Sequence, residues 1–93
     1  MDEIEIIARH YGKDHQLLKL SEELKEAAEA ADAYSENQTV ANLLHLSEEL
    51  ADVRIMVDQM EYLMPKLKAY CEIWRQYKLD RQMERMRNET DAG

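Results

Sequence analysis

The fold is decided by residues 16–52, which read QLLKLSEELKEAAEAADAYSENQTVANLLHLSEELAD. Two acidic clusters, EELKE at 22–26 and EELAD at 48–52, lie in this stretch on either side of a short polar segment. In each cluster two acids stand three residues apart, so on a helix they project from one face with Cβ atoms about 5–6 Å apart. These pairs are Glu23 with Glu26 and Glu49 with Asp52. Two such pairs on facing helices would hold a hard divalent cation.

The flanking sequence predicts two long antiparallel helices. Asp14 is a suitable N-cap for a helix that runs from about residue 15 to Tyr34. Thr39 is a suitable N-cap for a second helix, which ends near Met64. The residues between the two helices are polar and aperiodic, and so short a connection makes the helices antiparallel neighbours.

Each long helix carries an apolar stripe with the three-four spacing that faces a core. The two stripes are Leu17, Leu20, Leu24, Ala27, Ala31 and Tyr34 on the first helix, and Leu43, Leu46, Leu50, Val53, Val57, Met60 and Met64 on the second. A polar stripe that contains the acid pairs runs one position before each apolar stripe. Both pairs therefore have the same angular offset from the predicted core, as a shared site at the edge of an interhelical cleft requires.

Shorter or more polar segments lie at both ends of the chain. Residues 2–10 predict a short first helix, which Gly12 interrupts. Pro65 suits the first turn of a last helix that extends to about Arg87, because its missing N–H is not needed there. We expect the polar tail at 88–93 to fray and be disordered.

The composition predicts one all-α domain. The chain has 93 residues with two Gly, one Pro and no Phe, and strong helix formers dominate it. We expect a small antiparallel helical bundle over residues 1–93, with its core at about 14–87, completed by formation of a homodimer or homotetramer. The single cysteine, Cys71, and the lack of an apolar run of about 20 residues favour a cytoplasmic protein.

The net charge of −8 argues against nucleic acid or an anionic membrane as a partner, because both require a basic surface. The charge is unevenly distributed along the chain. Residues 1–65 contain 15 acidic and 5 basic residues, whereas residues 66–87 contain 7 basic and 3 acidic residues. The first part is therefore suited to cations, and the last helix is suited to anions.

The spacing of the acids resembles the signature of a known enzyme family. The pattern is Gln16-x-x-Lys19-x-x-Glu22-Glu23-x-x-Glu26, followed after 22 residues by Glu49-x-x-Asp52-Val53. It resembles the MazG-like, all-α nucleoside triphosphate pyrophosphohydrolases, whose signature is Glu-Glu-x-x-Glu followed by Glu-x-x-Asp. The resemblance extends from about Gln16 to Arg85.

The resemblance implies an enzyme that hydrolyses a nucleoside triphosphate between the α and β phosphates, giving the monophosphate and pyrophosphate. It implies Mg²⁺, or Mn²⁺ in its place, with the ligands Glu23, Glu26, Glu49 and Asp52. Glu22 and Glu48 would support these ligands or a further metal ion, and we assign both to the catalytic set. The last-helix residues Lys78 and Arg81 would contact the phosphates.

The residue types themselves support this chemistry. Mg²⁺ prefers carboxylates and water as ligands, and a bound cation relieves the repulsion between converging acids. The metal would polarise the α phosphate and lower the pKa of an attacking water. Basic side chains would offset the charge of the triphosphate. Further candidates for substrate contact are Gln16, Lys19, His45, Trp74 and Arg85.

Other interpretations stay open for the same residues. Each acidic cluster alone is typical of a solvated helix face, on which Lys19 simply pairs with Glu23. His45 and Trp74 are common in purely structural roles. A di-iron carboxylate bundle is disfavoured because it requires Glu-x-x-His, and no histidine here has a Glu three residues earlier. The main alternative function is a non-catalytic oligomeric helical adaptor, which explains the leucine stripes but not the matching offset of the acid pairs.

Overall fold

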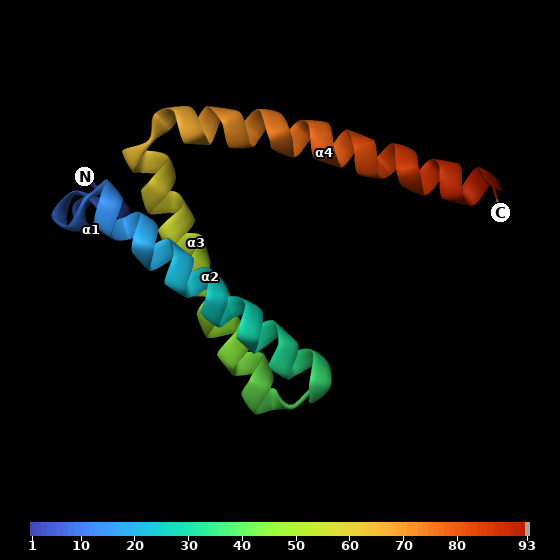
Figure 1. The fold of residues 1–93 in the computed structure, drawn as a ribbon, viewed down its shortest axis with the longest axis horizontal. Coiled ribbons are helices and arrows are strands. Elements are labelled where there is room, and N and C mark those ends of the chain that lie inside the picture. The colour runs from blue at the N-terminus through green and yellow to red at the C-terminus, as the bar shows by residue number, and fades with distance from the viewer. Residues whose placement is uncertain (93) are drawn as a thin grey trace.

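The computed structural model describes residues 1–92 and contains four α-helices, labelled in Figure 1. They are α1 (Glu3–Tyr11), α2 (Lys13–Glu36), α3 (Val40–Leu63) and α4 (Pro65–Ala92). These residues form no strand, so the predicted all-α class is confirmed. None of the helices in this part of the chain combines the length and the apolar character that crossing a membrane requires.

The four helices form a three-helix body with one projecting arm. α2 and α3 are an antiparallel pair, and α1 folds back against both of them (Figure 1). Within residues 1–92, α4 contacts only α3 and then runs away from the body. The radius of gyration is 17.0 Å, compared with about 12 Å for a compact chain of this length.

The predicted boundaries of the second long helix are confirmed. Thr39 Oγ1 accepts a hydrogen bond from the backbone N–H of Asn42 at 3.1 Å, which caps the start of α3. The Asn42 side chain also donates to the backbone oxygen of Asn37 at 2.8 Å, which holds the connection between α2 and α3. Met64 ends α3, and Pro65 is the first residue of α4.

The prediction that Asp14 caps α2 is wrong. α2 begins at Lys13, so Asp14 lies inside its first turn, where a carboxylate still favours the positive end of the helix dipole. Gly12 is the actual cap residue and joins α1 to α2 with φ 84° and ψ 168°. Only glycine adopts this region readily, so Gly12 fixes the reversal of direction between the two helices.

The tail, which was expected to fray, is helical as far as the structure describes it. α4 continues through Ala92, five residues beyond the expected end at Arg87, and Gly93 lies outside the described residues. No Gly or Pro interrupts this segment, and the Thr90 hydroxyl donates to the backbone oxygen of Met86 at 3.0 Å. The helix therefore has no local reason to stop at Arg87.

The core is small and lies between α1, α2 and α3. Its buried residues are Ala8, Gln16, Glu23, Ala27, Ala30, Glu49, Met56, Gln59 and Met60. The described part of α4 adds no fully buried residue, although Leu67 is half-buried. Ala8 on α1 is buried and lies before the expected core range of 14–87.

The two apolar stripes face this core only in part, because Ala27 and Met60 are buried in it while most of the leucines point away. Leu24 is 50% exposed and Leu50 is 44% exposed, while the polar stripe one position earlier occupies the seam between α2 and α3. Because the helices are antiparallel, the residue after each buried position lies on the same side of the pair on both helices. The stripes thus form one apolar surface of exposed and half-buried side chains, which we call the leucine face: Leu17, Leu20, Leu24, Leu43, Leu46, Leu50, Val53 and Val57.

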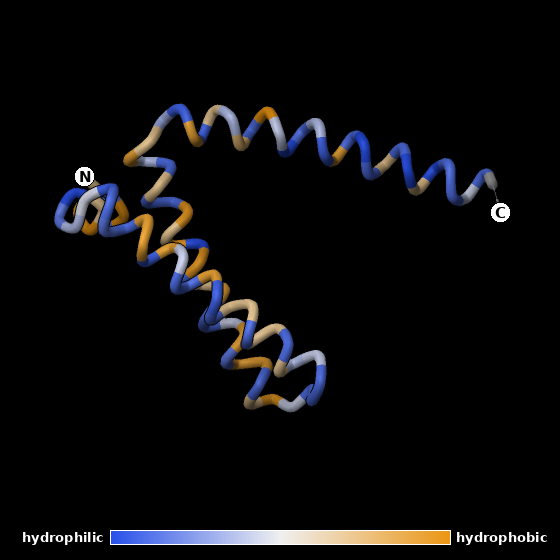
Figure 2. Tube along the Cα trace, viewed as in Figure 1, coloured by the Kyte–Doolittle hydropathy of each residue, from blue (hydrophilic) through white to orange (hydrophobic). Residues whose placement is uncertain are grey.

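Figure 2 shows the corresponding pattern of hydropathy along the backbone. Hydrophobic and hydrophilic positions alternate along α2 and α3, whereas the C-terminal half of α4 is mostly hydrophilic. Periodicity identified correctly which residues of the two long helices are apolar and aligned. It could not identify what covers them, because an apolar stripe fits an intrachain core and an interface between chains equally well.

Candidate metal centre

Three acids converge where α2 packs against α3. One carboxylate oxygen from each of Glu23, Glu49 and Asp52 lies within 4.8 Å of the other two. Glu23 is 6% exposed and Glu49 is 8% exposed, while Asp52 is half-buried. The structure thus brings together three of the four predicted metal ligands, which we call the acid cluster.

Two oxygens of the acid cluster lack a hydrogen-bond partner. Glu23 Oε2 and Glu49 Oε2 are both buried, and neither has a donor among the described residues. Buried carboxylate oxygens are almost always satisfied, because an unpaired buried charge is costly. A divalent cation between Glu23, Glu49 and Asp52 would satisfy both oxygens.

The dimensions and donor types of the acid cluster fit such a cation. Opposite ligands of an octahedral Mg²⁺ lie about 4.2 Å apart, since each Mg–O bond is about 2.1 Å. The 4.8 Å spread of the cluster therefore needs only small side-chain movements to close around an ion. A donor set made only of oxygen favours hard cations such as Mg²⁺ and Mn²⁺.

The negative charges of Glu23 and Glu49 are unfavourable where the two side chains lie. Burial raises the pKa of Glu23, and the charges of Glu26 and Asp52 raise it further, against the opposing effect of Lys19. Burial likewise raises the pKa of Glu49, with the Glu26 carboxylate as the next cause. Glu26 is exposed, but its effect on both buried acids shows that its charge borders the acid cluster.

The raised pKa values predict how stability depends on pH. The folded state holds protons on Glu23 and Glu49 more tightly than the unfolded state, so mild acid favours folding. We expect the free energy of unfolding of the metal-free protein to rise as pH falls from 7 towards the ordinary carboxyl pKa of 4.5. Urea denaturation in EDTA at several pH values measures this.

A matched variant isolates the cause of that pH dependence. Glu49→Gln removes one of the two groups with a raised pKa and should flatten the rise. Glu29→Gln changes an exposed acid on α2 and should leave it intact. Stability that decreases from pH 7 to pH 5 in the wild type would contradict the prediction.

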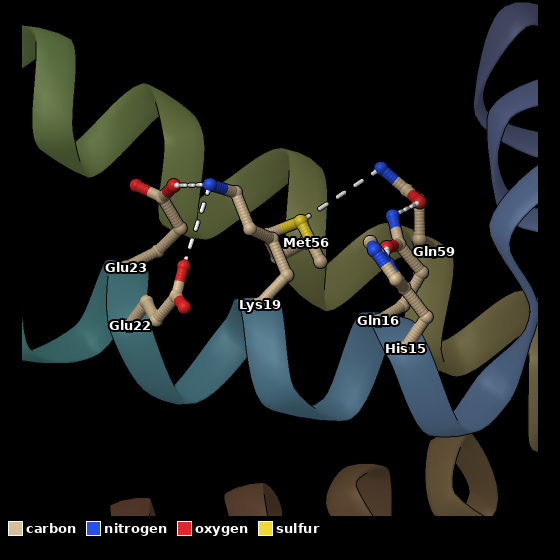
Figure 3. A network of polar contacts seen from close by, with 7 residues as sticks. All are labelled: His15, Gln16, Lys19, Glu22, Glu23, Met56 and Gln59. Atoms are coloured by element: carbon tan, nitrogen blue, oxygen red, sulfur yellow. Dashed lines mark hydrogen bonds and ion pairs between the residues drawn. The ribbon is translucent and has the colours of Figure 1, made fainter.

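Lys19 stands beside the acid cluster. Its Nζ lies 3.4 Å from Glu23 Oε1 and 3.5 Å from Glu22 Oε2, as Figure 3 shows. Hydrogen bonds to Glu23 and then Glu22 raise the pKa of Lys19, so the ammonium group keeps its charge near neutral pH. Glu22, which was predicted to be catalytic, lies on the exposed side of Lys19 and is not part of the acid cluster.

A second set of polar contacts, separate from those of Lys19, lies along the same seam (Figure 3). Gln16 Nε2 donates to Gln59 Oε1 at 2.6 Å, and both side chains are almost fully buried. His15 Nδ1 lies 2.7 Å from Gln16 Oε1. The sequence prediction included Gln16 as a substrate contact. The same polar stripe continues to Gln59, seven residues beyond Asp52, but the prediction gave Gln59 no role.

The other predicted site residues lie at or beyond the edges of the acid cluster. His45 Nδ1 is 4.0 Å from Glu49 Oε1 and is mostly exposed. Glu48, the second predicted catalytic residue, is exposed and makes no hydrogen bond or ion pair within residues 1–92. Trp74, Lys78, Arg81 and Arg85 are exposed on α4, which does not approach α2, so one chain does not bring them to the acids.

Comparison with protein-family models, curated proteins and solved structures gave no match to this chain.

Proposed function

We propose that this chain is a Mg²⁺-dependent nucleoside triphosphate pyrophosphohydrolase of the MazG-like type, which releases pyrophosphate and a nucleoside monophosphate. The observation that carries the proposal is the convergence of Glu23, Glu49 and Asp52 with two buried, unpartnered carboxylate oxygens. A non-catalytic adaptor would gain nothing from buried acids that repel one another. A metal-dependent hydrolase requires such acids.

Each residue at or beside the acid cluster has a distinct role in the proposed reaction. Glu23, Glu49 and Asp52 would hold the metal, and Glu26 adds negative charge at their border. A Mg²⁺ ion held there would neutralise phosphate charge and lower the pKa of a water ligand. Lys19 presents a cation to the triphosphate beside the metal ligands. Glu22 holds Lys19 from the solvent side.

The reaction is tested by incubation with ribo- and deoxyribonucleoside triphosphates in Mg²⁺ or in EDTA. Ion-exchange chromatography separates monophosphate and pyrophosphate from diphosphate and phosphate. We expect monophosphate and pyrophosphate only, and only with metal. A folded protein that gives no turnover and shows no Mg²⁺-induced rise in melting temperature would instead favour the adaptor.

We further propose that a second copy covers the leucine face. The chain exposes 7502 Å² of surface, about 1,900 Å² more than a compact monomer of 11.0 kDa is expected to expose. A standard protein interface buries about 800 Å² on each partner, so the excess on one chain is larger than one such interface needs. Two leucine faces packed together would make a four-helix bundle from two α2–α3 pairs.

A second copy also gives α4 a role in the reaction. Lys78, Arg81 and Arg85 do not reach the acid cluster of their own chain, because α4 contacts only α3 within residues 1–92. If they contact phosphates, they do so on the partner. The opposite charges of α4 and the acid cluster favour that arrangement, and Trp74 and Tyr77, which pack edge to face at 5.8 Å, would be covered by it.

A further inference from the structure

A pocket of about 640 Å³ lies between α1, α2 and α3, on the side of the helix pair away from the leucine face. Its volume falls in the range of small-molecule binding sites. Tyr11 from α1, His15 and Lys19 from α2, and Ile55 from α3 contribute to its walls. The buried amides of Gln16 and Gln59 contribute to the same lining.

The Gln59 amide has unused hydrogen-bonding capacity. Its oxygen accepts from Gln16, but its nitrogen meets only the Met56 sulfur at 3.9 Å, which is a weak acceptor. Gln59 is only 2% exposed but belongs to the pocket lining, so a ligand in the pocket would reach its N–H after a small shift of the Met56 side chain. An oxygen or nitrogen acceptor on such a ligand would satisfy this donor better than the sulfur does.

The position of the pocket relative to the acid cluster suggests what that ligand is. Gln16 precedes Glu23 by seven residues and Gln59 follows Asp52 by seven residues, so on antiparallel helices both amides lie about 10 Å from the acids in the same direction. Lys19 borders both places, because it lines the pocket and contacts Glu23. A ligand with phosphates at the acid cluster would pass Lys19 and place its other end in the pocket.

We propose that this pocket binds the nucleobase of the triphosphate and that Gln59 is a specificity-determining residue for it. The inference rests on the proposed function, which places the phosphates at the acid cluster. Flat heterocycles match the walls: Tyr11 stacks on His15 with ring centroids 4.8 Å apart, and Ile55 adds an apolar surface. Amide side chains recognise base edges through paired donors and acceptors.

Gln59→Met tests the proposal, because it removes the amide and nearly preserves side-chain volume. For the preferred triphosphate we expect KM to rise roughly ten-fold or more, and the preference among bases to weaken. The Mg²⁺-induced shift in melting temperature should stay unchanged. The matched control is Gln38→Met, which changes an exposed glutamine in the α2–α3 connection and should leave KM and base preference as in the wild type. Unchanged KM and base ranking in a folded Gln59→Met protein would overturn the proposal.

A second measurement separates this proposal from the proposed function. Free nucleosides and nucleoside monophosphates, titrated into the wild type without metal, should shift the side-chain amide resonances of Gln59 in ¹H–¹⁵N spectra. A shift in a protein without pyrophosphohydrolase activity supports the pocket and removes the proposed function. Turnover without any shift of these resonances would contradict nucleobase binding in the pocket but not the metal-dependent hydrolysis. Hydrolysis of inorganic triphosphate as fast as that of nucleoside triphosphates would have the same meaning. The titration decides the matter even if Gln59→Met does not fold.

Discussion

Glu49→Gln should lower turnover by about a thousand-fold or more, because it removes a ligand from a metal whose charge stabilisation accounts for several kcal/mol of the barrier. Glu49 is nearly buried, its Oε2 has no partner, and it lies opposite Glu23 in the acid cluster. The amide keeps the shape of the side chain but is a far weaker ligand for Mg²⁺. Steady-state turnover at saturating Mg²⁺ measures the loss.

The same substitution should stabilise the metal-free protein although it lowers turnover. Burial and then repulsion from Glu26 disfavour the charged form of Glu49, so the neutral amide should raise the melting temperature in EDTA. The Mg²⁺-induced rise in melting temperature should largely disappear at the same time. Loss of activity together with higher metal-free stability distinguishes a removed ligand from a damaged fold.

Glu29→Gln is the matched control for this variant. Glu29 lies on α2, one turn beyond Glu26, and its side chain is exposed. It should retain wild-type turnover and the full response to Mg²⁺. Full activity in Glu49→Gln would remove Glu49 from the metal site and with it the main support for the proposed function.

Mixing two inactive variants should restore activity if α4 acts on the partner. Glu49→Gln damages the acid cluster but keeps α4 intact, whereas the Lys78→Ala/Arg81→Ala double variant damages α4 but keeps the acids. After subunit exchange between two-fold dimers, about a quarter of all sites should combine an intact acid cluster with an intact α4. Turnover by the mixture, compared with each variant alone, measures this recovery.

The controls for the mixing experiment follow from the geometry. If α4 served its own chain, no mixed dimer would contain a complete site, and mixing would restore nothing. Adding Leu24→Glu to both variants places charges on the leucine face and should abolish the recovery by separating the copies. Adding Leu44→Glu instead changes an exposed leucine of α3 outside that face and should preserve the recovery. Sedimentation of the wild type as a monomer at micromolar concentration would exclude the second copy altogether.

Much of the fold followed from local signals in the sequence. Helix class, the cap at Thr39 and the start of α4 at Pro65 depend on propensity and on neighbours within a few residues, so a single chain reveals them. The convergence of Glu23, Glu49 and Asp52 was also predictable, because the two acid pairs have equal offsets from their apolar stripes. The helical period alone places these acids on the facing sides of the two helices.

Other features depended on packing that no local pattern encodes. The seam between α2 and α3 uses the polar stripe, because Ala27 and Ala30 allow close approach there while the leucines face outwards. The role of Gln59 depends on a contact with Gln16 across 43 positions of sequence. The path of α4 depends on the joint after α3. The sequence predicted that the basic residues of α4 contact the phosphates, but within one chain α4 contacts only α3 and does not bring them to the acid cluster.

The one-residue joint between α3 and α4 limits how the chain can vary in length. Only Met64 separates the two helices, so the direction in which α4 leaves is set by the angular position at which α3 ends. Inserting or deleting a single residue between Asp52 and Met64 would turn that exit by about 100° around the axis of α3. The acid cluster would stay in place, but the basic face of α4 would point elsewhere. If α4 acts on the partner as proposed, residues 53–63 are a spacer of fixed length, tolerant of substitution at its exposed positions and intolerant of single-residue insertion or deletion.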